Sequence, residues 1–430
     1  MSVATPREQL TTPDGAPRVV VTGTGMLTAL GADVAGTWAG LIAGRSGITT
    51  ITAFDPARVA SRIAGEVPGF DPSVVLDRKE QRRTDRYTQL ALVAARQALD
   101  EAGLPGRLDG ELAERTGILI GTGLGGGITF GEQVAISIEK GADRVSPFFV
   151  PMAIPNLAAG QAAIFFGALG PNYAIASACA SGGHAVGEAW EIIRRGDAEM
   201  MLAGSAEAVI TEPLVAGFAA MRALSTRNDD PTAASRPFDR GRDGFVIGEG
   251  AGVLVLETLA HARDRGSQPL GEVLGYGATA DASHVTLPAP GGVGAIRAVR
   301  RALEKARLTV DDVEHVNAHA TSTPEGDRTE LEMLRGLFGA RAGKVNVTAI
   351  KSMIGHTLGA AGSIEAIVTL RTLREGVIPP TINLDDPDEA AAGLDLTPNV
   401  ARERRMTIAV SNSFGFGGQN SALVFKRFAS

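Results

Sequence analysis

The sequence contains one cysteine, and its surroundings make it a candidate nucleophile. Cys179 follows the apolar stretch Tyr173–Ala176 and precedes a helical pattern over Gly187–Gly196. We therefore expect the thiol near a strand-to-helix turn, where the positive end of the helix dipole stabilises a thiolate. No Asp, Glu, Lys or Arg occurs from Val145 to Gly187. Taken alone, such a cysteine is more often a buried filler than a nucleophile.

Three polar segments elsewhere in the chain could supply chemical partners for that thiol. They combine histidine, lysine or aromatic side chains with small residues, and they are Val316–Pro324, Lys351–Gly362 and Ser411–Asn420. The first is a strand pattern that contains His319 and ends in a hydroxyl-rich turn, the second contains Lys351 and His356, and the third is a glycine loop with two aromatic residues. Each histidine taken singly is more often a packed core residue. His315 and His319 lie on a strand pattern and share no helical metal-binding face, so we reject a zinc site.

One glycine motif points to a different chemistry. The segment Gly121–Gly126 has the spacing G-x-G-x-x-G after a strand pattern, which is typical of dinucleotide-binding sites. No strand that ends in an acidic residue follows at the expected distance, and the next segment is an apolar run broken by prolines. An NAD-dependent oxidoreductase is therefore a distant alternative.

The composition is that of an ordinary globular protein rather than of a membrane or nucleic-acid-binding protein. The 430 residues are 44% apolar and 21% charged, and the net charge of −7 argues against a general nucleic-acid binder. The uncharged run over 145–170 is long enough to cross a bilayer, but Pro147, Pro151 and Pro155 would break a membrane-spanning helix. We therefore expect this run to form a buried core or a subunit interface and not a membrane span. One cysteine cannot form an internal disulfide, which favours a cytoplasmic location.

Alternation of β-like runs with helical patterns predicts an α/β protein whose pattern occurs twice. The polar residues 1–17 are expected to form a short disordered tail and not a secretory signal. The strand-like runs 18–22, 117–121, 172–177 and 252–256 have counterparts at 271–277, 314–319, 344–348 and 421–425. We therefore expect two halves of similar architecture, 18–266 and 267–430, with a site where they meet.

The segments around Cys179, His319, His356 and Phe416 together resemble the elongating β-ketoacyl-acyl-carrier-protein synthases, condensing enzymes of the thiolase superfamily, and most closely their type II. Further segments match the same family within about 18–425: Ala223–Asp229, Ala234–Asp239, Arg242–Val246 and Ile378–Asn383. The resemblance implies a thiolase-like five-layered αβαβα sandwich of two duplicated halves. The N-terminal half would carry the cysteine and the C-terminal half the two histidines.

The resemblance also implies a chemistry for these residues. An acyl group moves from a carrier-protein thioester onto Cys179, and the backbone N–H groups of Cys179 and Phe416 form the oxyanion hole. Malonyl-acyl-carrier protein loses CO₂, and neutral His319 and His356 donate to the oxygen of the resulting enolate. The carbanion then attacks the acyl group in a decarboxylative Claisen condensation, and Lys351 supports the histidines electrostatically.

Binding residues follow from the same resemblance. Thr321 and Thr323 are expected to bind the pantetheine arm. The gate and the acyl pocket are expected to contain Phe416, Phe414, Leu124 and Phe149, the last of them across a dimer interface. The basic residues expected to receive the acidic acyl carrier protein are Lys79, Arg82, Arg83, Arg144 and Arg222. No cofactor is expected beyond the 4′-phosphopantetheine that carries the substrates.

The cysteine count separates close relatives. Degradative thiolases use a second cysteine, initiating synthases use Cys-His-Asn, and chain-length factors lack the active cysteine, so the elongating Cys-His-His class remains. We expect a homodimer that elongates fatty acids. The alternative is a ketosynthase of a type II polyketide or polyene pathway that pairs with a chain-length factor, and a non-catalytic scaffold is a further one. Ala320 and Gln419 depart from the family's commoner glycine and threonine but remove no catalytic group.

Overall fold

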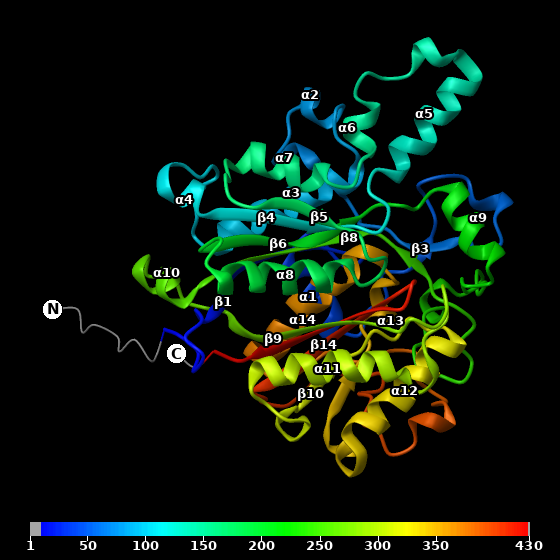
Figure 1. The fold of residues 1–430 in the computed structure, drawn as a ribbon. Coiled ribbons are helices and arrows are strands. Elements are labelled where there is room, and N and C mark those ends of the chain that lie inside the picture. Colours follow the sequence, from blue (N-terminus) through cyan, green and yellow to red (C-terminus); the bar gives the residue numbers. More distant parts are fainter. Residues whose placement is uncertain (1–9, 429–430) are drawn as a thin grey trace.

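The computed structural model describes residues 10–428, and its elements stack in five layers, three of helices and two of strands (Figure 1). The main helices of the layers, from top to bottom in Figure 1, are α3 (Arg86–Glu101) and α7 (Leu157–Phe166), then α8 (Ser181–Arg195) and α14 (Ala361–Glu375), then α11 (Val293–Ala306) and α12 (Pro324–Phe338). Strands lie between each pair of helical layers. The predicted αβαβα sandwich is confirmed.

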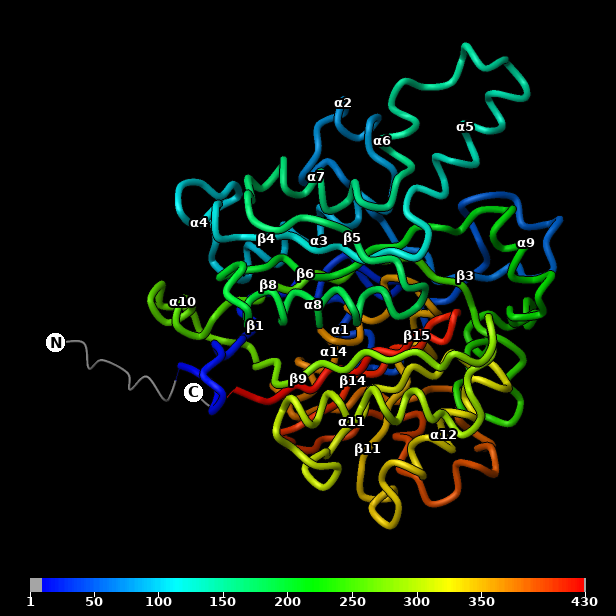
Figure 2. Tube along the Cα trace, viewed as in Figure 1, coloured from blue at the N-terminus to red at the C-terminus, as the bar shows by residue number. Residues whose placement is uncertain are grey.

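Ten strands are hydrogen-bonded into one mixed sheet made of two five-stranded halves. In spatial order they are β11 (Asn346–Thr348), β10 (His315–Asn317), β14 (Ile408–Gly415), β15 (Gln419–Lys426), β9 (Gly271–Ala280), β1 (Val19–Leu27), β8 (Gly250–Thr258), β6 (Met200–Glu207), β4 (Thr116–Gly121) and β5 (Asn172–Ile175). The halves are joined by a short antiparallel seam, in which Val19–Val21 pairs with Gly271–Val273. The two halves of the sheet lie on opposite sides of α8 and α14. Both helices therefore pack against strands of both halves (Figure 2).

The two halves have the same strand order and the same strand directions. Next to the seam, β1 pairs antiparallel with β8 as β9 does with β15, and the following pairs, β8 with β6 and β15 with β14, are also antiparallel. The two pairs nearest the outer edge of each half are parallel. The four predicted counterparts therefore occupy equivalent places, as the duplicated fold requires. The fifth pair, β6 and β14, was missed because Ser411–Ser413 replaces the apolar run that marks β6. The boundary at 266/267 stays a prediction.

The first strand extends beyond the predicted 18–22 because two glycines let a helix cross it closely. A Cβ at Gly23 would lie 2.1 Å from the carbonyl oxygen of Ala98 in α3, and one at Gly25 would lie 1.9 Å from that of Ala94. Glycine in a strand commonly marks such a close approach of another backbone. β1 therefore continues through both glycines to Leu27.

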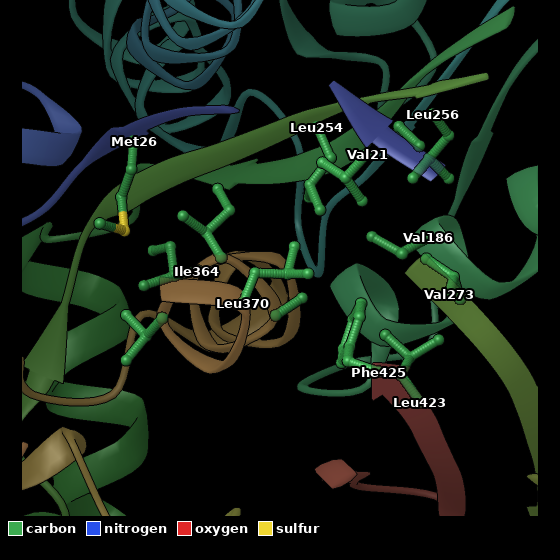
Figure 3. Close-up of a cluster of buried hydrophobic side chains, with 14 of the residues drawn as sticks. Val21, Met26, Val186, Leu254, Leu256, Val273, Ile364, Leu370, Leu423 and Phe425 are labelled. Atoms are coloured by element: carbon green, nitrogen blue, oxygen red, sulfur yellow. The ribbon is translucent and has the colours of Figure 1, made fainter. Parts of the chain in front are cut away.

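The largest hydrophobic core surrounds the central helices. Ile364 and Leu370 of α14 pack toward Leu254 of β8, while Val186 of α8 lies near Val273 of β9 (Figure 3). Of the fifteen residues of α14, only Arg371, Arg374 and Glu375 are not buried. A helix enclosed by sheets on both sides has no water-facing stripe, so its apolar and small residues run all round it.

The predicted disordered tail is wrong for its second half. Residues 1–9 lie outside the described part of the chain, but Leu10–Pro17 folds into a turn closed by a bridge between Thr11 and Pro17. Asp14 forms an ion pair with Arg194 at 2.8 Å. The polar composition of this segment does not indicate the turn, because Arg194, which holds Asp14, lies far away in the sequence.

The remaining elements are short or peripheral. The helices are α1 (Val34–Ile42), α2 (Arg78–Gln81), α4 (Gly110–Glu114), α5 (Gly127–Lys140), α6 (Phe149–Ala153), α9 (Glu212–Ala220), α10 (Leu259–Asp264) and α13 (Lys351–Ile354). Two small sheets contain β2 (Thr49–Thr50), β3 (Ile63–Gly65) and β7 (Ile247–Gly248), and β12 (Val377–Ile378) and β13 (Arg402–Glu403). Within residues 10–428, no helix is long and apolar enough to cross a membrane.

Candidate active site

The candidate nucleophile lies at a strained turn between β5 and α8. Cys179 precedes Ser181, the first residue of α8, by two positions, as the sequence predicted. Ala178 has a φ of 49°, a left-handed value that non-glycine residues seldom adopt and that concentrates at functional sites. The Ser181 hydroxyl closes the turn by accepting from the Ser177 N–H (2.9 Å) and donating to the Ala178 carbonyl (2.7 Å).

The glycine loop between β14 and β15 packs tightly against this turn. A Cβ at Gly415 would lie 2.6 Å from the Ser177 carbonyl oxygen and 3.2 Å from the Cys179 nitrogen, so a larger residue would push the loop away. This approach lets the backbone N–H groups of Phe416 and Cys179 interact with the sulfur. The two backbone donors predicted for an oxyanion hole are therefore brought together.

His356 is in direct contact with the thiol. Its Nε2 lies 3.0 Å from the Cys179 Sγ, and its Nδ1 accepts from the Leu358 N–H at 3.3 Å. Because Nδ1 is an acceptor, the ring proton sits on Nε2 and points at the sulfur. Leu358 has a φ of 48°, so strained backbone also flanks this histidine. The Phe245 ring packs edge-on against His356, with centroids 5.4 Å apart.

His319 lies beside His356 and is held from behind by charged groups. The centroids of the two imidazoles are 5.4 Å apart and their planes are nearly perpendicular. Glu330 accepts from the His319 N–H at 2.9 Å, which fixes the backbone there. Lys351 is 1% exposed, donates to the His319 carbonyl at 2.6 Å and forms an ion pair with Glu365. Lys351 therefore acts on the histidines through the backbone of His319 and through its positive charge.

Burial and the Lys351 charge keep both histidines neutral. Burial is the larger effect, and the nearby ammonium adds to it, so the pKa of His319 and that of His356 lie well below the usual range. At neutral pH each ring therefore carries one N–H donor and no charge. This is the state that the predicted donor role needs.

The stabilisation of a thiolate that the sequence predicted from the helix dipole is outweighed by burial of the sulfur. Burial raises the pKa of the Cys179 thiol to about 12, although the Lys351 charge and the Phe416 N–H act in the opposite direction. The partial charge at the start of α8 is worth about 0.3–2 kcal/mol at best, which is less than the cost of burying a sulfur anion. Cys179 therefore rests as a thiol and loses its proton during the reaction.

We expect alkylation of Cys179 by iodoacetamide to accelerate about tenfold per pH unit from pH 7 to pH 10, because only the thiolate reacts and its fraction grows tenfold per unit below the pKa. Mass spectrometry of the intact protein measures the rate, and the single cysteine makes the added mass unambiguous. N-acetylcysteine controls for the reagent. A rate that levels off below pH 9 would contradict the raised pKa.

A cavity of about 600 Å³ contains the reactive groups and has walls from both halves. Its apolar lining includes Leu124, Phe218, Met221, Phe245, Leu358, Phe414 and Phe416. The hydroxyls of Thr321 and Thr323 also line it, with their Oγ1 atoms 3.0 Å apart. The structure thus places Cys179, His319 and His356 around one space, together with Leu124 and the residues predicted for the gate and the pantetheine arm. Lys351 does not line the cavity and lies buried behind His319.

Phe149 does not reach this cavity within the single chain. It lies on α6, its ring is 5.6 Å from that of Phe130 on α5, and both helices belong to an arm that projects from the body (Figure 1). Its predicted place in the acyl pocket was across a dimer interface, and that stays a prediction.

The five predicted basic residues are exposed but are not one patch in the single chain. Arg222 follows α9 and lines the cavity, whereas Lys79 belongs to α2, and Figure 1 shows α2 and α9 well apart. Arg82 and Arg83 follow α2 directly, and the Arg83 guanidinium lies 4.4 Å from the centroid of the Phe148 ring. Arg144 lies between α5 and α6.

The glycine motif Gly121–Gly126, which resembles a dinucleotide-binding loop, binds a carboxylate of the protein itself. The N–H groups of Gly123 (2.6 Å) and Leu124 (3.2 Å) donate to the buried carboxylate of Glu207, and so does the Thr122 hydroxyl (2.9 Å). The donors that would hold a pyrophosphate are therefore already bound to the protein's own anion. The structure gives no support to the oxidoreductase alternative.

Several residues of the site were not identified from the sequence. Glu207, Glu330 and Glu365 are buried carboxylates that hold the reactive loops, and Phe245 packs on His356. The carboxylates carry no local signal, because a single glutamate in a strand or helix looks like a surface residue. Phe245 lay within a matched segment, so its position could have been inferred from the resemblance.

Comparison with known proteins identifies relatives over nearly the whole chain. Residues 16–262 match the family model "Beta-ketoacyl synthase, N-terminal domain" and residues 270–385 match "Beta-ketoacyl synthase, C-terminal domain". The chain is 48% identical over 411 residues to 3-oxoacyl-[acyl-carrier-protein] synthase 2 of Staphylococcus aureus strain N315, covering 96% of this chain and 98% of the relative. The protein of the same name from Synechocystis sp. is 47% identical over 412 residues, with the same shares covered.

Solved structures give the same grouping. A beta-ketoacyl synthase from Burkholderia phymatum STM815 superposes with a TM-score of 0.89 at 37% identity. The ishigamide ketosynthase/chain length factor superposes with a TM-score of 0.90 at 34% identity, and a type II polyketide ketosynthase in complex with its acyl-carrier protein with 0.87 at 33%. Each match covers 96% of this chain and all of the other chain.

Proposed function

Because this chain belongs to the β-ketoacyl synthase family, whose members are condensing acyltransferases, we propose that its catalytic residues are Cys179, His319, His356 and Lys351. The observation that carries this assignment is the 3.0 Å contact between the His356 Nε2 and the Cys179 Sγ, in a cavity that also holds His319. Cys179 carries the acyl group, and the two histidines stabilise the enolate formed from malonyl-acyl-carrier protein.

The first half-reaction is acyl transfer to Cys179. The sulfur attacks the thioester carbonyl, and the tetrahedral oxyanion accepts from the backbone N–H groups of Cys179 and Phe416. The C–S bond to the pantetheine then breaks, and the proton of the Cys179 thiol ends on the departing pantetheine sulfur. The apolar lining of the cavity, with Leu124 and Phe245, suits an acyl chain.

The second half-reaction forms the new carbon–carbon bond. The malonyl carboxylate leaves as CO₂, and the electron pair of the broken bond forms an enolate whose oxygen accepts from N–H groups of His319 and His356. The enolate carbon attacks the acyl carbonyl on Cys179, the C–S bond breaks, and the Cys179 sulfur takes up one proton. The product is a β-ketoacyl thioester on the carrier protein, and no further cofactor takes part.

An acyl carrier protein is the proposed partner. The hydroxyls of Thr321 and Thr323 line the cavity and suit the amides of a pantetheine arm. Arg222 lines the same cavity and is exposed, so it can receive an acidic carrier protein at the entrance. Lys79, Arg82, Arg83 and Arg144 are proposed to extend that surface in a dimer.

The edge of the sheet next to the arm is the proposed dimer interface. β5 is an edge strand, and an unpaired strand edge is a ready template for pairing with another strand. Exposed large apolar side chains occur on β5, α7 and the arm: Phe130, Val134, Ile138, Val150, Ile154, Ile164 and Tyr173. Apolar groups gathered on one region mark protein–protein contacts. A homodimer covers them and brings Phe149 to the acyl pocket.

We expect Tyr173→Asp on β5 to convert the dimer into monomers at micromolar concentration and to lower condensation at least about tenfold. The added charge would be buried at the interface, and Phe149 would lose its place. Light scattering on a size-exclusion column measures the mass. Tyr173→Phe is the conservative control, and Val400→Asp places the same charge on an exposed apolar residue outside the proposed interface. A dimer that survives Tyr173→Asp contradicts this interface.

Of the two candidate activities, fatty-acid elongation has the stronger support from the comparisons. The chain is 47–48% identical to the curated synthases and 33–34% identical to the polyketide ketosynthases. The test incubates the purified chain with acyl-carrier proteins of graded acyl length and with malonyl-carrier protein, and mass spectrometry follows products. Turnover by the chain alone supports elongation by a homodimer. Turnover that requires a chain-length factor supports the polyketide alternative. A cytoplasmic location remains part of this proposal.

A further inference from the structure

Glu207 ties together two loops that come from different halves of the molecule. Its carboxylate accepts four hydrogen bonds: three come from Thr122, Gly123 and Leu124, and the fourth comes from the Gly359 N–H at 3.0 Å. The first group follows β4 in the N-terminal half, whereas Gly359 follows His356 in the C-terminal half.

The two loops are in backbone contact around this carboxylate. A Cβ at Gly359 would lie 2.3 Å from the Gly123 nitrogen and 2.5 Å from the Glu207 Oε2. Leu124 and Leu358 both line the cavity, and the Leu358 N–H holds the Nδ1 of His356. Glu207 thus connects one wall of the acyl pocket to the loop that orients the catalytic N–H.

Within residues 10–428, each hydrogen-bond partner of the Glu207 carboxylate is a donor. The Thr122 Oγ1 accepts from the Gly125 N–H at 3.0 Å, so its own proton points to Glu207. Burial raises the pKa of Glu207, but a protonated acid would direct its O–H at one of four donors, which favours the charged form. Glu207 has no cation partner among the described residues, so it places a negative charge in the wall of the cavity that holds the thiol.

We propose that Glu207 is a positioning residue that couples the acyl-pocket wall at Leu124 to the placement of the His356 N–H against the acyl-thioester. The proposal rests on the assignment of Cys179 as the acyl carrier. It predicts two separable effects of Glu207, one of its charge on the thiol and one of its length on the two loops. Neither effect follows from a merely structural role.

The test compares Glu207→Gln with Glu207→Asp. Glutamine removes the charge, so alkylation of Cys179 by iodoacetamide at pH 8 should become about tenfold faster, the equivalent of one pKa unit. Aspartate keeps the charge but is too short to reach both loops, so alkylation should stay slow. Both variants should lower kcat/KM for condensation, about tenfold or more with a long acyl group and less with acetyl, because the long chain depends on the wall at Leu124.

Glu257→Gln is the matched control, because Glu257 is fully buried in the same half but binds Arg265 and His261 away from the cavity. It should lower the melting temperature without changing alkylation or chain-length preference. Equal losses at all chain lengths in both Glu207 variants, or alkylation of Glu207→Gln at the wild-type rate, overturn the proposal. If neither Glu207 variant folds, Thr122→Val removes one hydrogen-bond donor to the Glu207 carboxylate. Its alkylation rate and its kcat/KM at each acyl length are then compared with those of the wild type. Alkylation needs no turnover, so absence of condensation in the wild type would instead contradict the proposed function.

Discussion

Cys179→Ala should lose condensation activity by about 10⁴-fold or more, because removal of a covalent nucleophile leaves no route for the acyl group. The variant should still release CO₂ slowly from malonyl-carrier protein, since His319 and His356 and their N–H donors remain in place. Intact-mass spectrometry after incubation with acyl-carrier protein should show the acyl adduct on the wild type and none on the variant. Radiometric or mass-spectrometric CO₂ release measures the residual reaction.

Cys179→Ser is the matched control for this experiment. It keeps the size and a hydroxyl nucleophile, but an alkoxide is harder to form in a buried site, so condensation should fall nearly as far as with alanine. Both variants should retain the wild-type fold by circular dichroism, because the side chain lies beside a cavity and leaves little void. An acyl adduct on any other residue of the wild type, or an active Cys179→Ala protein, would refute the nucleophile assignment.

Lys351→Ala should produce the second-largest loss, in both activity and stability. It leaves the Glu365 carboxylate buried without its cation, and breaking a buried ion pair in this way costs about 3–5 kcal/mol of unfolding free energy. It also removes the donor to the His319 carbonyl and the charge that lowers the pKa of Cys179. We therefore expect condensation to fall by about 10²–10³-fold and alkylation of Cys179 to become slower. Denaturant unfolding and the alkylation assay measure the two effects.

The double variant Lys351→Met with Glu365→Gln separates stability from electrostatics. A neutral pair of similar volume avoids the uncompensated charge, so much of the lost stability should return. Alkylation should remain slow and condensation should remain impaired, because the positive charge beneath His319 is still missing. A double variant with wild-type alkylation and turnover would mean that Lys351 serves only to neutralise Glu365.

The reactive groups could be predicted from sequence because the segments that contain them resemble one family when they are taken together. Cys179 is unique in the chain and precedes a helix pattern, and His319, His356 and Phe416 lie in segments rich in small residues. Each residue alone favoured a structural role, and only the four segments together gave the resemblance that identified the site. Four of the five strand pairs of the two halves could also be predicted, because each of these strands lies in a β-like run at an equivalent place in the sequence. The resemblance then supplied how these pieces meet.

The electrostatics of the site could not be predicted, because they depend on burial and on contacts between distant segments. The helix dipole near Cys179 was visible in the sequence, but the depth that raises the pKa of the thiol was not. Glu207 contacts residues 85 and 152 positions away in the chain, and no pattern around it signals either contact. The same limit concealed the turn at Leu10–Pro17, which is held by an ion pair to Arg194.

The matching topology of the two halves has a consequence for the residues that each half can supply. Cys179 lies between β5 and α8, and Lys351 and His356 lie between the equivalent strand β11 and the equivalent helix α14. The nucleophile and its partner thus occupy equivalent positions in the two halves, and they meet where the halves face each other, with the His356 Nε2 3.0 Å from the Cys179 Sγ. An assembly of two identical copies would place the same side chain at both positions. One chain encodes the two positions separately, so one can hold a thiol and the other an imidazole.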